Sequence, residues 1–166
     1  AIPIKLIDIL FIRQKNEILF YGYKGRYSGN SASLYRYCLS NTDQLNPIWL
    51  LDRKDLTNFG DRKNYFLLPN KDSNALEHIK LLLKIASAKV VVVSLVGDLR
   101  FYCSLLYSKK RLEVLLPQGI TIKSGGIMSK HLNNKEKKLW ENHSRRFDII
   151  SVSSRDEQYR VSASLN

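Results

Sequence analysis

Polar residues that could take part in chemistry follow the apolar strands of this chain. Leu115-Leu116-Pro117 is typical of the end of a buried strand, and Gln118 and Gly119 come directly after it, with Lys123 nearby. In α/β proteins, ligands bind and reactions occur at the carboxyl ends of strands. A glutamine side chain can hydrogen-bond a hydroxyl or a phosphate oxygen. It takes up no proton near neutral pH and so cannot serve as a general base.

A second candidate site is the loop from Gly22 to Asn30, which follows an expected strand at 18–21. Glycines allow the backbone to approach a ligand, and the start of the next helix can bind a phosphate. The spacing of Gly22, Gly25 and Gly29 is not the dinucleotide fingerprint, which excludes a nicotinamide or flavin site. An ordinary flexible turn explains the same glycines.

A third candidate follows the valine-rich segment at 89–94, where Ser94 precedes Gly97-Asp98. Ser94 and Asp98 suit the binding of a hydroxyl or a phosphate. Alternatively, Gly97 forms the turn and Asp98 caps the next helix.

Histidines and cysteines do not indicate a metal or a nucleophile. His78, His131 and His143 have no neighbouring ligands at metal spacing, and no Ser-His-Asp or Cys-His arrangement can be recognised. We expect solvated histidines and no metal or other cofactor. Cys38 and Cys103 lie in apolar contexts and are interpreted as buried thiols in a reducing compartment, with a disulfide as the alternative.

The charge of the chain favours an anionic partner. It carries 27 Lys and Arg against 15 Asp and Glu, a net charge of +12. Nucleic acid, anionic lipid and a phosphate-bearing polymer or nucleotide all fit this excess. Three basic groups recur in the second half, and we expect them to form an anion-facing side. They are Lys109-Lys110-Arg111, Lys135/Lys137/Lys138 and Arg145-Arg146.

Short strands alternate with helices, which predicts an α/β, Rossmann-like, doubly wound and mainly parallel sheet. Four consecutive valines at 90–93 show no alternation, as expected for a strand covered on both faces. Ser73 is expected to cap the helix at 74–88, and Ser154 with Glu157 a terminal helix. The strands are expected at 18–21, 47–51, 64–68, 89–94, 112–116 and 147–152, and the other helices at 31–40 and 134–143.

The helical period also predicts which residues share a face. In the helix at 31–40 these are Leu34, Tyr37 and Cys38. In the helix at 74–88, Lys80 and Lys84 are expected to be solvated. The apolar positions of that helix are Leu76, Ile79, Leu82, Leu83 and Ala86.

We divide the chain into an apolar segment, 1–15, and one domain, 16–166, a usual domain size. No apolar run approaches the ~20 residues that span a bilayer. The apolar segment is expected to pack on its own domain or on a neighbouring one. The alternative is that it lies on a membrane surface.

Five segments taken in order resemble the CDP-glycerol glycerophosphotransferase family, which builds teichoic acids and related capsule polymers. The resemblance covers roughly residues 16 to 160; each motif is weak alone, and the ordered set is moderately specific. The segments are Leu19 to Asn30, Ile48 to Asp52, Ala86 to Ser94 with Gly97-Asp98-Leu99, Leu115 to Lys123, and Phe147 to Ser154.

The resemblance implies the N-terminal half of a GT-B fold, with the donor nucleotide bound mainly by a C-terminal domain that this chain lacks. Arg26, Lys123 and the later basic groups would then hold an anionic polyol-phosphate or lipid-linked acceptor, and Gln118 and Gly119 would line the cleft. Asn30, Ser94 and Asp98 match further motif positions of the binding region. The resemblance implies no metal, and a location on the cytoplasmic face of the cell membrane.

The chain departs from the family where the family has its histidines. Gln118 stands at the position of the candidate general base, Pro117 replaces a tryptophan, and Leu95 lies near a second histidine position. The alternative function is therefore a non-catalytic basic module that binds anionic polymer, lipid or nucleic acid. Interleaved aromatic and basic residues such as Tyr23, Lys24 and Tyr35 suit stacking on single strands, although no nucleic-acid motif is present.

Overall fold

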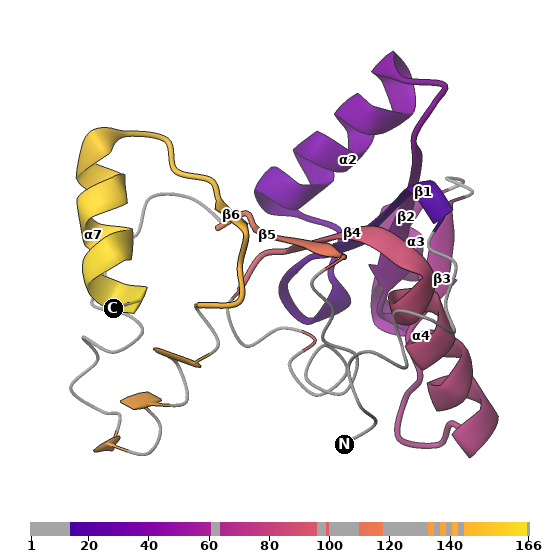
Figure 1. The fold of residues 1–166 in the computed structure, drawn as a ribbon. Helices are drawn as coiled ribbons and strands as arrows, with labels where there is room; N and C mark the ends of the chain where they lie inside the picture. Colours follow the sequence, from indigo (N-terminus) through magenta and orange to yellow (C-terminus); the bar gives the residue numbers. More distant parts are fainter. Residues whose placement is uncertain are drawn as a thin grey trace.

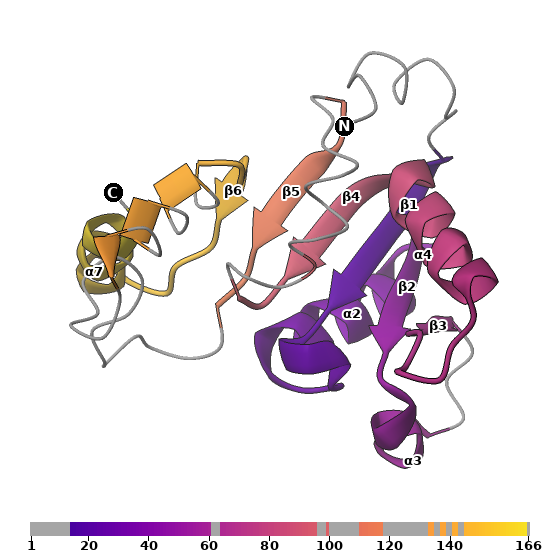
Figure 2. The same ribbon diagram turned by 90° about the horizontal axis from the view of Figure 1, so that it is seen from below.

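The computed structural model describes residues 14–60, 64–95, 99, 110–117, 133–134, 137–138, 141–142 and 145–165. Its centre is a six-stranded sheet in the order β3-β2-β1-β4-β5-β6, in which every neighbouring pair is parallel (Figure 2). The predicted Rossmann-like parallel sheet is confirmed. The strands are β1 (Gln14–Tyr21), β2 (Asn46–Leu51), β3 (Tyr65–Leu67), β4 (Ala88–Val93), β5 (Leu112–Leu115) and β6 (Ile149–Ile150).

Strand register sorts the apolar side chains into two layers. Leu19 of β1 is aligned with Ile48 of β2 and with Val91 of β4. Because successive side chains point to opposite faces, these residues all lie on one face of the sheet. Their neighbours in sequence, such as Phe20, lie on the other face. Both layers are buried, which confirms the prediction that the valine strand is covered on both sides.

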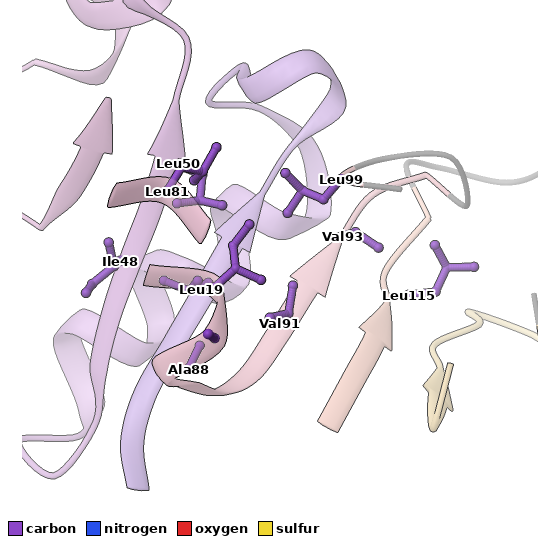
Figure 3. Packing of buried hydrophobic residues seen from close by; sticks show 11 residues of the cluster. Leu19, Ile48, Leu50, Leu81, Ala88, Val91, Val93, Leu99 and Leu115 are labelled. Atoms are coloured by element: carbon purple, nitrogen blue, oxygen red, sulfur yellow. The ribbon is translucent and has the colours of Figure 1, made fainter. Parts of the chain in front are cut away.

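Helices cover both faces of the sheet (Figure 1). Residues of α2 and α3 pack into the layer around Phe20, and residues of α4 pack into the layer around Leu19. Figure 3 shows Leu81 of α4 beside Leu19 and Leu50 in the layer around Leu19. The helices are α2 (Gly29–Asn41), α3 (Leu56–Phe59), α4 (Ala75–Ser87) and α7 (Arg155–Leu165), with 3-10 turns η1 (Tyr23–Gly25) and η2 (Arg53–Asp55).

The buried face of α2 differs from the predicted one. Cys38 is buried as expected, and burial raises the pKa of its thiol. Leu34 and Tyr37 are instead exposed, and Tyr35 is fully buried. Tyr35 can be buried because its hydroxyl donates to the carbonyl of Asn64 at 2.9 Å and its ring packs edge-on against other aromatic rings. The rings of Tyr35, Phe20, Trp49, Tyr27 and Phe59 form one cluster.

The predicted cap and apolar face of α4 were also partly wrong. Asn74, not Ser73, is the N-cap, because its side chain accepts the Glu77 N–H at 3.1 Å. Leu81 and Ile85 face the core. The predicted core positions that are exposed instead are Leu76, Ile79 and Leu83, whereas Ala86 is buried and Leu82 half-buried as expected.

At the end of the sheet, the strand predicted at 147–152 is shorter. It comprises only Ile149–Ile150. The predicted cap of α7 is confirmed in part. Ser154 accepts the Glu157 N–H at 3.1 Å, and the Glu157 carboxylate accepts from the backbone N–H and the hydroxyl of Ser153.

Lys84 was predicted to be solvated and is not. Its ammonium lies 2.6 Å from the carboxylate of Glu17, which is 1% exposed on the central strand β1. Ser87 also donates to this carboxylate, at 3.4 Å. A carboxylate buried at this depth needs a partner, and Lys84 provides it. The ion pair therefore joins the C-terminal half of α4 to β1.

Replacing Lys84 with alanine should lower the free energy of unfolding by about 2 kcal/mol, because Glu17 would remain buried without its cation. Lys80→Ala is the matched control on the exposed side of the same helix and should change stability by less than about 0.5 kcal/mol. Urea denaturation of both variants measures the difference. Equal stabilities for the two variants would contradict the structural role of the ion pair.

Candidate functional site

The sheet has a topological switch point between β1 and β4. The connection that follows β1 runs over one face through α2, whereas the connection into β4 runs over the other face through α4. The ends of the central strands remain tied together, since the Ser94 N–H donates to the Tyr21 carbonyl at 3.2 Å and Leu116 N–H to the Val93 carbonyl at 2.8 Å. Open α/β sheets bind their ligands outside the carboxyl ends at such a point.

Two polar contacts bring the start of α2 to this edge. The hydroxyls of Ser31 and Ser94 lie 2.8 Å apart and are buried. The Asn30 side-chain amide donates to the carbonyl of Pro117 at 2.7 Å. The structure thus joins three segments that are distant in sequence, namely the ends of β4 and β5 and the first turn of α2.

Two of the predicted site residues, Asn30 and Ser94, therefore belong to one polar site. Pro117 belongs to it through its carbonyl, and Gln118 follows Pro117 in the sequence. Gln118, Gly119, Lys123 and Asp98 lie outside the described residues.

Position 22, in the loop between β1 and α2, has no space for a side chain and therefore requires glycine. A Cβ atom there would lie 2.2 Å from the Arg26 carbonyl oxygen and 2.8 Å from the Trp49 ring. Gly22 itself has an ordinary φ of −73°. The loop folds tightly on itself at this point.

Backbone contacts fix the rest of this loop. The Gly25 carbonyl accepts from the Asp52 N–H at 3.1 Å and from the Trp49 indole at 3.4 Å. The buried carboxylate of Asp55 accepts from the Tyr27 N–H and from the Asn58 amide. The loop after β1 is therefore bonded to the loop after β2, and its exposed side chains extend from a fixed backbone.

Four exposed cationic side chains follow β1 and β2 at this carboxyl edge, and we call them the cationic edge. They are Lys24, Arg26, Arg53 and Lys54. Lys24 has a left-handed backbone (φ 53°, ψ 32°), a conformation that costs a non-glycine residue energy and occurs often at functional sites. Its ammonium lies 5.2 Å from the centre of the Tyr23 ring.

Arg26 was predicted as a ligand-binding residue, and it lies on the cationic edge. Arg53 and Lys54 also lie on the cationic edge, but they were not predicted as candidate site residues. Their position just after the second predicted strand could have indicated them. Arg53 contacts the Glu77 carboxylate at 3.4 Å, but both side chains are well exposed. Such a surface pair contributes little to stability and leaves Arg53 accessible to a ligand.

Among the described residues, the basic groups of the second half do not gather on one anion-facing side. Arg111, directly before β5, is buried, and its guanidinium bonds the carboxylate of Glu113 within that strand. Lys110 precedes β5 at the opposite, amino edge. Arg145 pairs with Glu141.

The described residues contain no group of three or more histidine, cysteine or acidic side chains that could hold a metal ion. Within the same part of the chain, no helix has the length and apolar character to cross a bilayer. Tyr35, which was considered for base stacking, lies inside the aromatic cluster instead.

No model of a protein family and no curated protein matches this chain. Several solved structures do match it, and they show that its fold is similar to that of TagF. One structure of this wall teichoic acid polymerase, a His-to-Asn variant after a 30-minute soak with CDPG, matches 98% of this chain with a TM-score of 0.69 and 16% identity. Another, described simply as the wall teichoic acid polymerase TagF, matches 92% with a TM-score of 0.68 and 16% identity.

The matched region spans 40% of the first TagF chain and 36% of the second. The chain therefore corresponds to about two-fifths of TagF, and at 14–16% identity the likeness concerns the fold. This agrees with the predicted Rossmann-like fold.

The Ser31–Ser94 hydrogen bond can be tested with a double-mutant cycle. Ser31→Ala and Ser94→Ala should each cost about 1–2 kcal/mol, because each leaves a buried hydroxyl without its partner. The double variant should cost less than the sum by about 1 kcal/mol, since both partners are then absent. Chemical denaturation measures all four proteins, with exposed Ser33→Ala as the control. Additive losses would contradict a direct bond.

Proposed function

We propose that this chain is the acceptor-side domain of a glycerophosphotransferase-like enzyme. The intact enzyme transfers a polyol phosphate from a CDP-activated donor to a teichoic acid or capsule-type polymer. The observation that carries the proposal is the cationic edge, which borders the switch point of a TagF-like fold. A polyol-phosphate chain carries a regular series of negative charges, and a row of exposed cations attracts such a polymer.

Each part of the edge has a distinct role in this proposal. The guanidinium groups of Arg26 and Arg53 bind phosphate oxygens in a forked geometry, whereas Lys24 contributes a compact charge. Asn30 orients the hydroxyl end of the acceptor at the switch point, and the buried Ser31–Ser94 hydrogen bond holds the start of α2 against β4 there. Gln118 and Lys123 complete the site from the segment that follows Pro117.

The donor side is assigned to a further domain, because TagF is about two and a half times as long as the region matched here. Gln118 cannot remove a proton from the acceptor hydroxyl, so a base must come from elsewhere in the intact enzyme or the domain binds without turnover. The family resemblance implies a lipid-linked acceptor, so we place the protein peripherally at the inner face of the cell membrane.

The chain should bind short glycerol-phosphate oligomers, with an affinity that falls as salt screens the charges. Arg26→Gln should weaken binding about tenfold by removing one charge-assisted contact to phosphate. Isothermal titration calorimetry at low and physiological salt measures both effects. Lys80→Gln is the matched control, since it removes the same charge from the outer side of α4, away from the edge.

Three results would contradict the proposal. Equal losses for Arg26→Gln and Lys80→Gln would mean that net charge alone binds the oligomer. Tighter binding of single-stranded RNA than of glycerol phosphate would favour a nucleic-acid module. Turnover of a CDP-polyol by these 166 residues alone would exclude the division of roles between two domains.

A further inference from the structure

The outer face of α4 is apolar, although this helix lies at the surface of the sheet. Leu76, Ile79 and Leu83 are 56%, 48% and 47% exposed, and they follow one another at helical spacing. The opposite face packs its own apolar residues, including Leu81 and Ile85, against the sheet. A surface helix normally presents polar residues outward, and a helix that is apolar on both sides is normally covered on both.

The chain itself supplies a segment suited to covering this face. Nine of the first 13 residues are apolar, and they include an uninterrupted run from Ile9 to Ile12. These residues lie outside the described part of the structure. Their apolar composition suits contact with the apolar outer face of α4.

The topology places the start of β1 beside the end of α4. The first described residue of β1, Gln14, is aligned with Ala88 of β4. Ala88 directly follows Ser87, the last residue of α4. The chain therefore enters the sheet next to the point where α4 ends. From Leu83 back to Leu76, α4 rises about 10 Å, and thirteen residues reach that far in a helical or an extended form.

We propose that residues 1–13, the part of the apolar segment that precedes β1, cover the outer face of α4 formed by Leu76, Ile79 and Leu83. In this proposal the segment packs on its own domain rather than on a membrane surface. Burial of both apolar surfaces drives the contact. This inference does not depend on the proposed transferase function.

The test measures how fast a cysteine on α4 reacts with a maleimide in the full chain. Leu83→Cys should react about tenfold more slowly than Leu56→Cys, because a covered thiol reacts only when the contact opens. Leu56 is the matched control, since it is 40% exposed and lies on α3. Peptide mapping by mass spectrometry separates these thiols from Cys38 and Cys103. Equal reaction rates at positions 83 and 56 would overturn the proposal. In this comparison the sequence of residues 1–13 is unaltered.

A second comparison identifies what covers the face. Adding the Leu6→Asp and Leu10→Asp substitutions should raise the maleimide reaction rate at position 83 to that of an uncovered thiol and leave the rate at position 56 unchanged. Circular dichroism checks that the variant is folded. Protection that survives these substitutions would overturn the proposal. So would protection that depends on protein concentration, which indicates a second copy, or protection that appears only with anionic phospholipid vesicles, which indicates a membrane.

Discussion

The central strand β1 is hydrogen-bonded to β2 on one side and to β4 on the other, and both of its faces are buried. Leu19 and Phe20 are fully enclosed on opposite faces. Because the side-chain period of a strand is two, a slip of one residue would exchange the two layers. This register fixes which helix packs on which face, and so it places the switch point between β1 and β4.

The proposed site depends on that arrangement. Once β1, β4 and β5 are aligned, Asn30 and Ser31 at the start of α2 meet Pro117 and Ser94 at the strand ends. The backbone bonds between the loops after β1 and β2 then position the cationic edge. The contacts that stabilise the loops are made mostly by backbone atoms and buried groups, which leaves the charged side chains exposed for a ligand.

The sequence allowed the sheet to be predicted because its strands are short apolar runs with clear ends, above all the valine strand. Asn30 and Ser94 could be proposed as site residues because they follow strands or begin a helix. The faces of α2 and α4 could not be predicted correctly, because amphipathic period alone does not show that Tyr35 has a buried partner for its hydroxyl. Nor does it show that Lys84 pairs with Glu17, which lies 67 positions away. Such long-range pairings depend on tertiary structure.

The central claim is that the carboxyl edge at the switch point binds a polyol-phosphate chain. The most direct measurement is the change in backbone amide chemical shifts when a glycerol-phosphate oligomer is titrated into the isotope-labelled chain. We predict that the largest changes occur at Gly22–Ser31, Asp52–Lys54 and Ser94. Changes concentrated at the amino edge, for example at Lys89 and Lys110, or no changes at saturating oligomer, would contradict it.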